Sequence, residues 1–190
     1  MLDRRLLLNN ILKDRPDNLL VVSGLGSSTW DLSAAGDHHQ NFCFIGAMGQ
    51  AGAFALGLAM AQKDKRIVLV TGDGELLMSL GVLATIANQA PKNLVLLVMD
   101  NESYAETGGQ PTATAGPTDL EQVARGCGIE ICATFRNEKD GAKIQEMVHS
   151  GSGPIFINAK VLATPPTLVF PHSFDGVTAI DRFRGAVLSS

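Results

Sequence analysis

The sequence predicts an α/β fold: a doubly wound, mainly parallel sheet with helices on both faces, in a single domain spanning residues 1–190. The strand-like segments are apolar throughout, which is typical of parallel strands that are buried on both faces. Helix-like segments separate successive strands, as right-handed crossover connections require. The 190 residues, 45% hydrophobic and 18% charged, suit one well-buried domain.

The first half of the chain is expected to begin with a short helix over residues 6–12. "NLLVVSG" (18–24) is an apolar, β-branched run that ends in glycine, so a buried strand is expected. "GQAGAFALGLAMAQ" (49–62) is too long and too rich in alanine for a strand and predicts a helix. "RIVLVTG" (66–72) predicts a second buried strand.

The next segments continue the alternation. "ELLMSLGVLATIANQA" (75–90) predicts a helix that Pro91 stops. "NLVLLVMD" (93–100) predicts a third strand. Residues 119–128 predict a helix with Thr118 as its cap. The remaining expected elements are a strand over 129–135, a helix over 137–150, a strand over 153–161 and a helix over 179–188.

Composition narrows the function classes. The net charge is −4 and no basic stripe occurs, so nucleic acid is not an expected partner. No stretch of 18 apolar residues predicts a membrane span, and the N-terminus does not resemble a secretory signal, so a cytoplasmic location is expected. Cys43, Cys127 and Cys132 have no metal-site spacing and are interpreted as core thiols.

Ligands of doubly wound sheets bind beyond the carboxyl ends of the strands, which here directs attention to the loops 23–41, 72–75 and 100–117. Asp73 follows the second strand, and Asn101 follows the third after one helix, one turn and one strand. A βαβ unit of that size brings both side chains to one edge, where they could share a cation that also binds phosphate. Taken alone, Gly-Asp-Gly favours an ordinary turn in which Asp73 or Glu75 stabilises the helix start, and the second ligand at the end of the next strand shifts the interpretation to a cation site.

The "GDG" of 72–74, followed 26 residues later by Asn101, resembles the thiamin-diphosphate-binding motif of thiamin-dependent enzymes, in their diphosphate-binding (PP) domain. The resemblance implies that Mg²⁺ is bound by the side chains of Asp73 and Asn101 and by the backbone carbonyl of Ser103. Asp100 stands where the family often has asparagine. The implied cofactor-binding residues are Gly46, Ala47, Met48, Gly72, Asp73, Gly74, Glu75, Asn101, Ser103 and Tyr104.

A second segment, "FIGAMGQAGAFALGLAMA", resembles the stretch before the PP-domain helix in the same enzymes. The resemblance implies that Met48 is the bulky residue that bends the cofactor, and that backbone groups of Gly46 and Met48 contact its aminopyrimidine ring. A polarizable, unbranched side chain suits such a wedge. From the residues alone, Met48 could also be a core methionine before a helix, and the Gly-Asp-Gly motif favours the wedge.

"GDGELLMSLGVLATIA", "DNESYAETGGQPT" and "DRFRGAVL" look most like sulfopyruvate decarboxylase β subunits and the C-terminal half of phosphonopyruvate decarboxylases. The resemblance implies decarboxylation of a 2-oxo acid that carries a second anionic group. In this family the glutamate that activates the cofactor comes from a pyrimidine-binding domain, for which the chain has no room. A separate α subunit carrying that domain is therefore expected, and the chain alone is expected to be inactive.

Other features leave alternatives open. The small-residue helix over 49–62 permits close approach of a partner or a second copy, or tight packing on its own sheet. His38 and His39 are weak candidates for a catalytic role beside a solvated one, and Thr107 and Gln110 lie in a loop that could order over the cofactor. The loops at the strand ends contain no lysine or arginine, so a partner or a remote arginine is expected to meet the substrate's anionic group.

Two other functions compete with the decarboxylase. One is the thiamin-binding β subunit of a 2-oxoacid:ferredoxin oxidoreductase, whose loop also carries a TGGQ-like run, although the scattered cysteines argue against it. The other is a non-catalytic module that binds a phosphate ligand.

Overall fold

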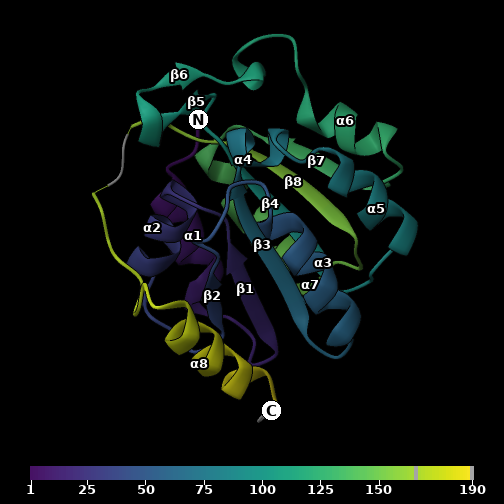
Figure 1. Cartoon of the computed structure of the whole chain (residues 1–190). Helices are drawn as coiled ribbons and strands as arrows, with labels where there is room; N and C mark the ends of the chain where they lie inside the picture. The colour runs from purple at the N-terminus through teal and green to yellow at the C-terminus, as the bar shows by residue number, and fades with distance from the viewer. Residues whose placement is uncertain (165–166, 189–190) are drawn as a thin grey trace.

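The computed structural model describes residues 1–164 and 167–188 and confirms the predicted fold class. Six strands form one parallel sheet in the order β2-β1-β3-β4-β8-β7, with helices on both faces (Figure 1). The strands of this sheet are β1 (Leu19–Ser23), β2 (Asn41–Cys43), β3 (Arg66–Gly72), β4 (Leu94–Asp100), β7 (Ile131–Phe135) and β8 (Ile155–Lys160).

The two faces of the sheet carry separate hydrophobic clusters. Leu20 and Val22 of β1 contribute to one cluster, whereas Leu19 and Val21 contribute to the other. This alternation explains why the strands are apolar throughout. The first cluster is covered by α3 (Ala51–Ala61), α4 (Asp73–Leu77), α5 (Gly81–Gln89), α6 (Leu120–Gly126) and α8 (Gly176–Leu188), and the second by α1 (Arg4–Lys13), α2 (Ser27–Ala34) and α7 (Gly141–Ser150).

The strand order reverses beside β1. After β1 the chain forms the edge strand β2, then crosses back to β3 on the other side of β1 and continues to β4. A reversal of this kind opens a crevice above the carboxyl ends of the strands on either side of it. The loops after β1 and β3 therefore flank the place where a ligand is expected.

The helix predicted over 75–90 is divided in two. It begins earlier, at Asp73, with Gly72 as its N-cap, and α4 ends at Leu77. Residues 78–80 form turns with i→i−3 bonds, such as that from the amide of Met78 to the carbonyl of Glu75, before α5 begins at Gly81. The chain thus bends directly after the Gly-Asp-Gly turn, and Asp73 lies in the first turn of a short helix.

Two regions expected to be loops contain regular structure. Residues 23–41 include α2 and the start of β2, which the polar run "SSTWDLSA" did not indicate. Residues 100–117 form a hairpin of β5 (Ser103–Tyr104) and β6 (Gln110–Pro111) with 3₁₀ turns at Ala105–Thr107 and Ala113–Ala115. Another 3₁₀ turn, Glu138–Asp140, precedes α7. No helix in the described part of the chain is long and apolar enough to cross a membrane.

Candidate active site

A cavity of about 290 Å³ lies at the carboxyl edge of the sheet, at the strand-order reversal. Its walls come from the loop after β1 with the start of α2, from residues 72–75 after β3, and from residues 101–107 after β4. Met48, in the segment before α3, Met99, near the end of β4, and Arg4, in the first turn of α1, complete the described lining. The structure therefore brings both strand ends that the sequence singled out to one cavity.

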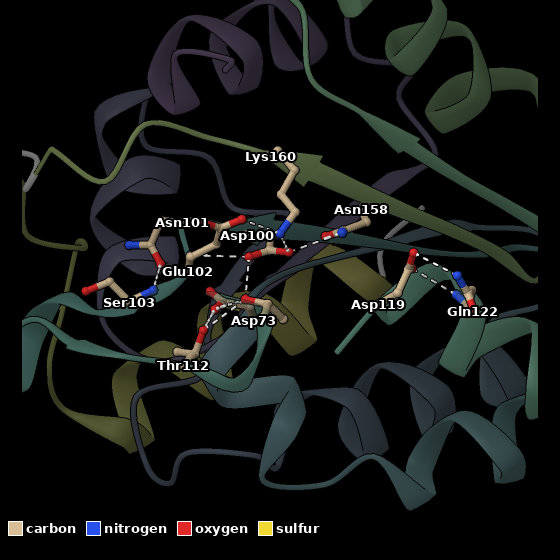
Figure 2. A network of polar contacts seen from close by, with 11 residues as sticks. Asp73, Asp100, Asn101, Glu102, Ser103, Thr112, Asp119, Gln122, Asn158 and Lys160 are labelled. Atoms are coloured by element: carbon tan, nitrogen blue, oxygen red, sulfur yellow. Dashed lines mark hydrogen bonds and ion pairs between the residues drawn. The ribbon is translucent and has the colours of Figure 1, made fainter. Parts of the chain in front are cut away.

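Asp73 is buried at the cavity wall, with 2% of its surface exposed. Its Oδ2 accepts hydrogen bonds from the hydroxyls of Thr112 (2.5 Å) and Thr114 (3.0 Å), as Figure 2 shows for Thr112. Burial raises the pKa of the Asp73 carboxyl, and the nearby Asp100 raises it further, while the two hydroxyls partly offset this. Both threonine hydroxyls bond to Oδ2, and no other side chain among residues 1–164 and 167–188 bonds to Oδ1, which keeps its capacity to bind a cation.

Asp100, the acid directly before Asn101, is compensated by a cation from the neighbouring strand. Its Oδ2 lies 2.7 Å from Nζ of Lys160 and accepts a hydrogen bond from Asn158 at 3.2 Å, both from β8 (Figure 2). The hydroxyl of Thr114 lies 2.8 Å from Oδ1 and shares its single proton between this oxygen and Oδ2 of Asp73. Lys160 also lies 2.7 Å from Glu102. Asp100 is therefore part of a buried ion-pair network with Lys160.

Asn101 and Ser103 line the cavity beside Asp73. The backbone amide of Ser103 donates to Oδ1 of Asn101 at 3.1 Å, which holds the side chain in a tight turn. Glu102 between them has a φ of +61°, a left-handed conformation that non-glycine residues adopt rarely. The turn thus places the side-chain amide of Asn101 and the backbone of Ser103 on the same wall of the cavity.

Glu75 also lines the cavity, and its carboxylate is held by hydrogen bonds within the protein. Its carboxylate is buried and accepts hydrogen bonds from the hydroxyl of Thr71 (3.0 Å) and the amide of Gly49 (3.3 Å). Burial raises its pKa, and these hydrogen bonds act in the opposite direction. A Cβ at Gly24 would lie 1.6 Å from Oε2 of Glu75, so the first strand end makes room for this carboxylate. Glu75 therefore ties the segment after Met48 to the Gly-Asp-Gly turn.

The glycines of this turn have different surroundings. A Cβ on Gly72 would have no atom within 4 Å, so its backbone faces open space. A Cβ on Gly74 would lie 2.4 Å from the ring of Tyr104. The ring of Tyr104 therefore packs directly on the backbone at the start of α4.

Only some of the other predicted site residues line the cavity. Met48 and Thr107 line the cavity, but Gly46, Ala47 and Gln110 are exposed and do not. His38 and His39 stack on each other with centroids 4.5 Å apart, and neither lines the cavity. Burial, together with the positive charge of Arg15, lowers the pKa of His38.

Several cavity residues were missed by the sequence reasoning. Ser27, Ser28 and Trp30 belong to α2, which was expected to be a loop, and Arg4 lies far away in sequence. Oε1 of Glu106 accepts hydrogen bonds from Ser27 (2.6 Å) and from the indole of Trp30 (3.2 Å). These bonds tie the loop after β4 to α2, a long-range pairing for which the sequence carries no local signal.

Comparison with known proteins points to one family. The model described as "Thiamine pyrophosphate enzyme, C-terminal TPP binding domain" matches residues 24–159. The sulfopyruvate decarboxylase subunit beta of Methanocaldococcus jannaschii is 38% identical over 67% of this chain and 68% of its own length. The phosphonopyruvate decarboxylase of Streptomyces viridochromogenes is 37% identical over 90% of this chain but 40% of its own length.

The fold is shared with a solved 2-oxoglutarate:ferredoxin oxidoreductase from Magnetococcus marinus. The TM-score is 0.71 at 20% identity, over 94% of this chain and 66% of the other. At that identity the likeness concerns the fold alone. The family match spans both strand ends that line the cavity. The chain therefore belongs to the thiamine pyrophosphate enzymes, as a member of their C-terminal TPP-binding domain family.

Proposed function

We propose that the chain, as a single PP-type domain over residues 1–190, is the β subunit of a thiamin-diphosphate- and Mg²⁺-dependent 2-oxoacid decarboxylase. The substrate class is that of the sulfopyruvate and phosphonopyruvate decarboxylases, which are among its relatives. The observation that carries the proposal is that Asp73 and Asn101, from the ends of adjacent strands, line one cavity together with Met48.

The residues present fit a magnesium ion. Oδ1 of Asp73 accepts no hydrogen bond from another side chain in the described part of the chain, and Asn101 and Ser103 offer amide and carbonyl oxygens on the same wall. Mg²⁺ prefers such oxygen ligands and is commonly bound by one or two carboxylates together with substrate phosphates. A divalent cation would also compensate the buried charge of Asp73, which burial alone disfavours.

The residues also fit a diphosphate. The backbone at Gly72 faces open space, and Gly74 and Glu75 lie in the first turn of α4, where amides have no partner within the helix. The carboxylate of Glu75 accepts hydrogen bonds from Thr71 and Gly49, and the backbone amide of Glu75 remains available to a phosphate. Met48, on the same cavity, would shape the region beyond the diphosphate.

Thiamin diphosphate supplies, when bound, a nucleophilic carbon and an electron sink for decarboxylation. The side chains of this chain bind and orient that group, and the hydrogen bonds of Glu106 to α2 close one side of the cavity. The acids that line the cavity are Asp73, Glu75 and Glu106, and each already has a described role. The glutamate that activates the cofactor is therefore assigned to a pyrimidine-domain α subunit.

An uncharged surface on α3 and α5 suits that partner or a second copy of the chain. Ala53, Gly57 and Met60 form the exposed side of α3, and Met78, before α5, is 61% exposed. The two helices lie against each other, since a Cβ on Gly52 would approach Val82 at 3.2 Å. Exposed apolar surfaces of this kind mark interaction sites. Gly52, which is buried, lets α3 pack closely on α5, so α3 also has close packing within the chain, the other alternative that the sequence left open.

The experiment is a reconstitution. The chain is assayed alone and mixed with a purified pyrimidine-domain subunit, with thiamin diphosphate, Mg²⁺ and sulfopyruvate, phosphonopyruvate or pyruvate. Release of CO₂ is expected from the mixture only, and faster from the substrates with a second acid group. Turnover by the isolated chain would contradict the divided active site. Iron–sulfur absorption in the purified protein would instead favour the ferredoxin-dependent class.

A further inference from the structure

The N-terminus lies at the same edge of the sheet as the cavity. Leu2 forms a parallel bridge with Val161, directly after β8, through bonds of 2.9 Å and 3.0 Å to the backbone of residues 160 and 162. Asp3 caps α1 by accepting from the amides of Arg5 and Leu6. Figure 1 shows the N-terminus at the same end of the sheet as α4 and the β5–β6 hairpin. These constraints hold the first turn of α1, with Arg4, at the carboxyl edge.

Arg4 is held in place by a buried acid. Arg4 is 6% exposed, and its Nε donates to Oδ2 of Asp31, which is fully buried on α2. The other oxygen of Asp31 accepts from Nε of Arg5 at 3.2 Å. Two guanidinium groups thus share one carboxylate, so the cluster of Arg4, Arg5 and Asp31 carries one net positive charge.

The two arginines differ at their outer ends. Nη2 of Arg5 donates to the carbonyl of Thr167, whereas the Nη nitrogens of Arg4 have no hydrogen-bond partner among residues 1–164 and 167–188. Arg4 lines the cavity and Arg5 does not. A guanidinium has five N–H donors, and the Nη groups of Arg4 are not among the buried atoms without a partner, so on the cavity wall they are open to a ligand that accepts hydrogen bonds.

We propose that Arg4 is the anion-binding residue of this cavity and that Asp31 is its positioning residue. The inference rests on the proposed function and supplies the cation that the strand-end loops lack. The other charged residues on the described cavity wall are the acids Asp73, Glu75 and Glu106. The planar fork of a guanidinium matches tetrahedral oxyanions, so the ligand class is a phosphate, phosphonate or sulfonate group.

Such a group has two sources in this enzyme: the end of the cofactor's diphosphate, or the second acid group of the substrate. In the first arm of the test, calorimetry measures the affinity of the full chain for Mg²⁺–thiamin diphosphate and, without metal, for inorganic pyrophosphate and sulfoacetate. Arg4→Gln is compared with Arg5→Gln, a matched control that removes the same charge from the same carboxylate outside the cavity. Arg4→Lys restores the charge without the fork, and thermal melting verifies that each variant folds.

The second arm uses the reconstituted enzyme and compares KM for sulfopyruvate with KM for pyruvate. If Arg4 holds the cofactor, Arg4→Gln weakens Mg²⁺–thiamin diphosphate and pyrophosphate binding by about 10- to 100-fold, and Arg4→Lys recovers part of it. If Arg4 holds the substrate, the variant weakens sulfoacetate binding and raises KM for sulfopyruvate by a similar factor, with KM for pyruvate and cofactor affinity unchanged.

Equal affinities and KM values for Arg4→Gln and Arg5→Gln would overturn the inference. Wild-type chain that binds the anions through Arg4 but shows no Mg²⁺-dependent cofactor binding would overturn the proposed function and leave the anion site standing. If both variants bind the cofactor as the wild type does, and anion binding does not depend on Arg4, the proposed function stands and the inference about Arg4 is overturned.

Discussion

Replacing Lys160 with methionine tests the buried network that accompanies Asp100. Lys160 is 5% exposed, and Asp100 is fully buried. Methionine keeps most of the length and apolar volume of the lysine side chain but removes the charge that lies 2.7 Å from Asp100 and 2.7 Å from Glu102. The substitution therefore leaves a buried carboxylate without its cation.

The expected loss of unfolding free energy in Lys160→Met depends on the hydrogen bonds and hydration that Asp100 and Glu102 keep. Breaking a buried ion pair by removing one partner costs about 3–5 kcal/mol. Asp100 keeps hydrogen bonds from Asn158, Thr114 and the amide of Glu102, and the Glu102 side chain is 35% exposed and can be hydrated by water. We therefore expect a loss near the lower limit, about 3 kcal/mol. That is a large share of the roughly 5–15 kcal/mol by which domains are stable.

The double variant Asp100→Asn/Lys160→Met removes both charges and is expected to recover all but about 1 kcal/mol of the loss. Urea unfolding followed by Trp30 fluorescence measures the free energies, with Lys63→Met, an exposed lysine, as the control. A loss below about 1 kcal/mol in Lys160→Met, or no recovery in the double variant, would refute the compensation of Asp100 by Lys160.

Three further outcomes follow from close contacts and burial. Gly24→Ala would force a Cβ to 1.6 Å from a carboxylate oxygen of Glu75, so unfolding free energy is expected to fall by about 1–3 kcal/mol in urea titrations; a neutral result would contradict this packing. Gly74→Ala would displace the ring of Tyr104, 2.4 Å from the new Cβ, and is expected to weaken Mg²⁺–thiamin diphosphate binding in calorimetry; unchanged affinity would argue against a close backbone approach. Burial raises the pKa of Cys132 to about 11, so the thiol stays protonated at pH 8. Iodoacetamide labelling, detected by mass spectrometry, is therefore expected to be slow in the native protein and fast in urea. Equal labelling rates would contradict the burial of this thiol.

The general fold was predictable because the period and length of the apolar segments depend on local sequence. The predicted strand 66–72 matches β3 residue for residue, because its central residues 67–70 are apolar and buried on both faces of the sheet. The helix over 27–34 was not predicted, for the opposite reason. α2 is short and polar and follows Gly26, which has a positive φ of 76°, so neither a hydrophobic period nor a capping side chain indicated a helix. The break after Leu77 depends on tertiary packing that propensity does not contain.

The cavity was predictable where its residues follow strands. Asp73 and Asn101 were placed together because adjacent parallel strands end at one edge of the sheet. Arg4 could not be placed, because its position depends on the pairing of Leu2 beyond β8 and on Asp31 from another helix. The role of Glu75 was also hidden, since its partners Thr71 and Gly49 are set by the angle between β3 and the start of α3.

The most direct test of the proposed cofactor site is calorimetry of thiamin diphosphate binding to the chain with Mg²⁺ and with EDTA, for wild type, Asp73→Ala and Asp64→Ala. Asp64 is an exposed acid remote from the cavity lining and serves as the matched control. We predict binding that requires Mg²⁺, is lost in Asp73→Ala and is retained in Asp64→Ala. Equal affinity in EDTA, or in Asp73→Ala, would contradict the assignment of Asp73 as the residue through which the metal holds the diphosphate.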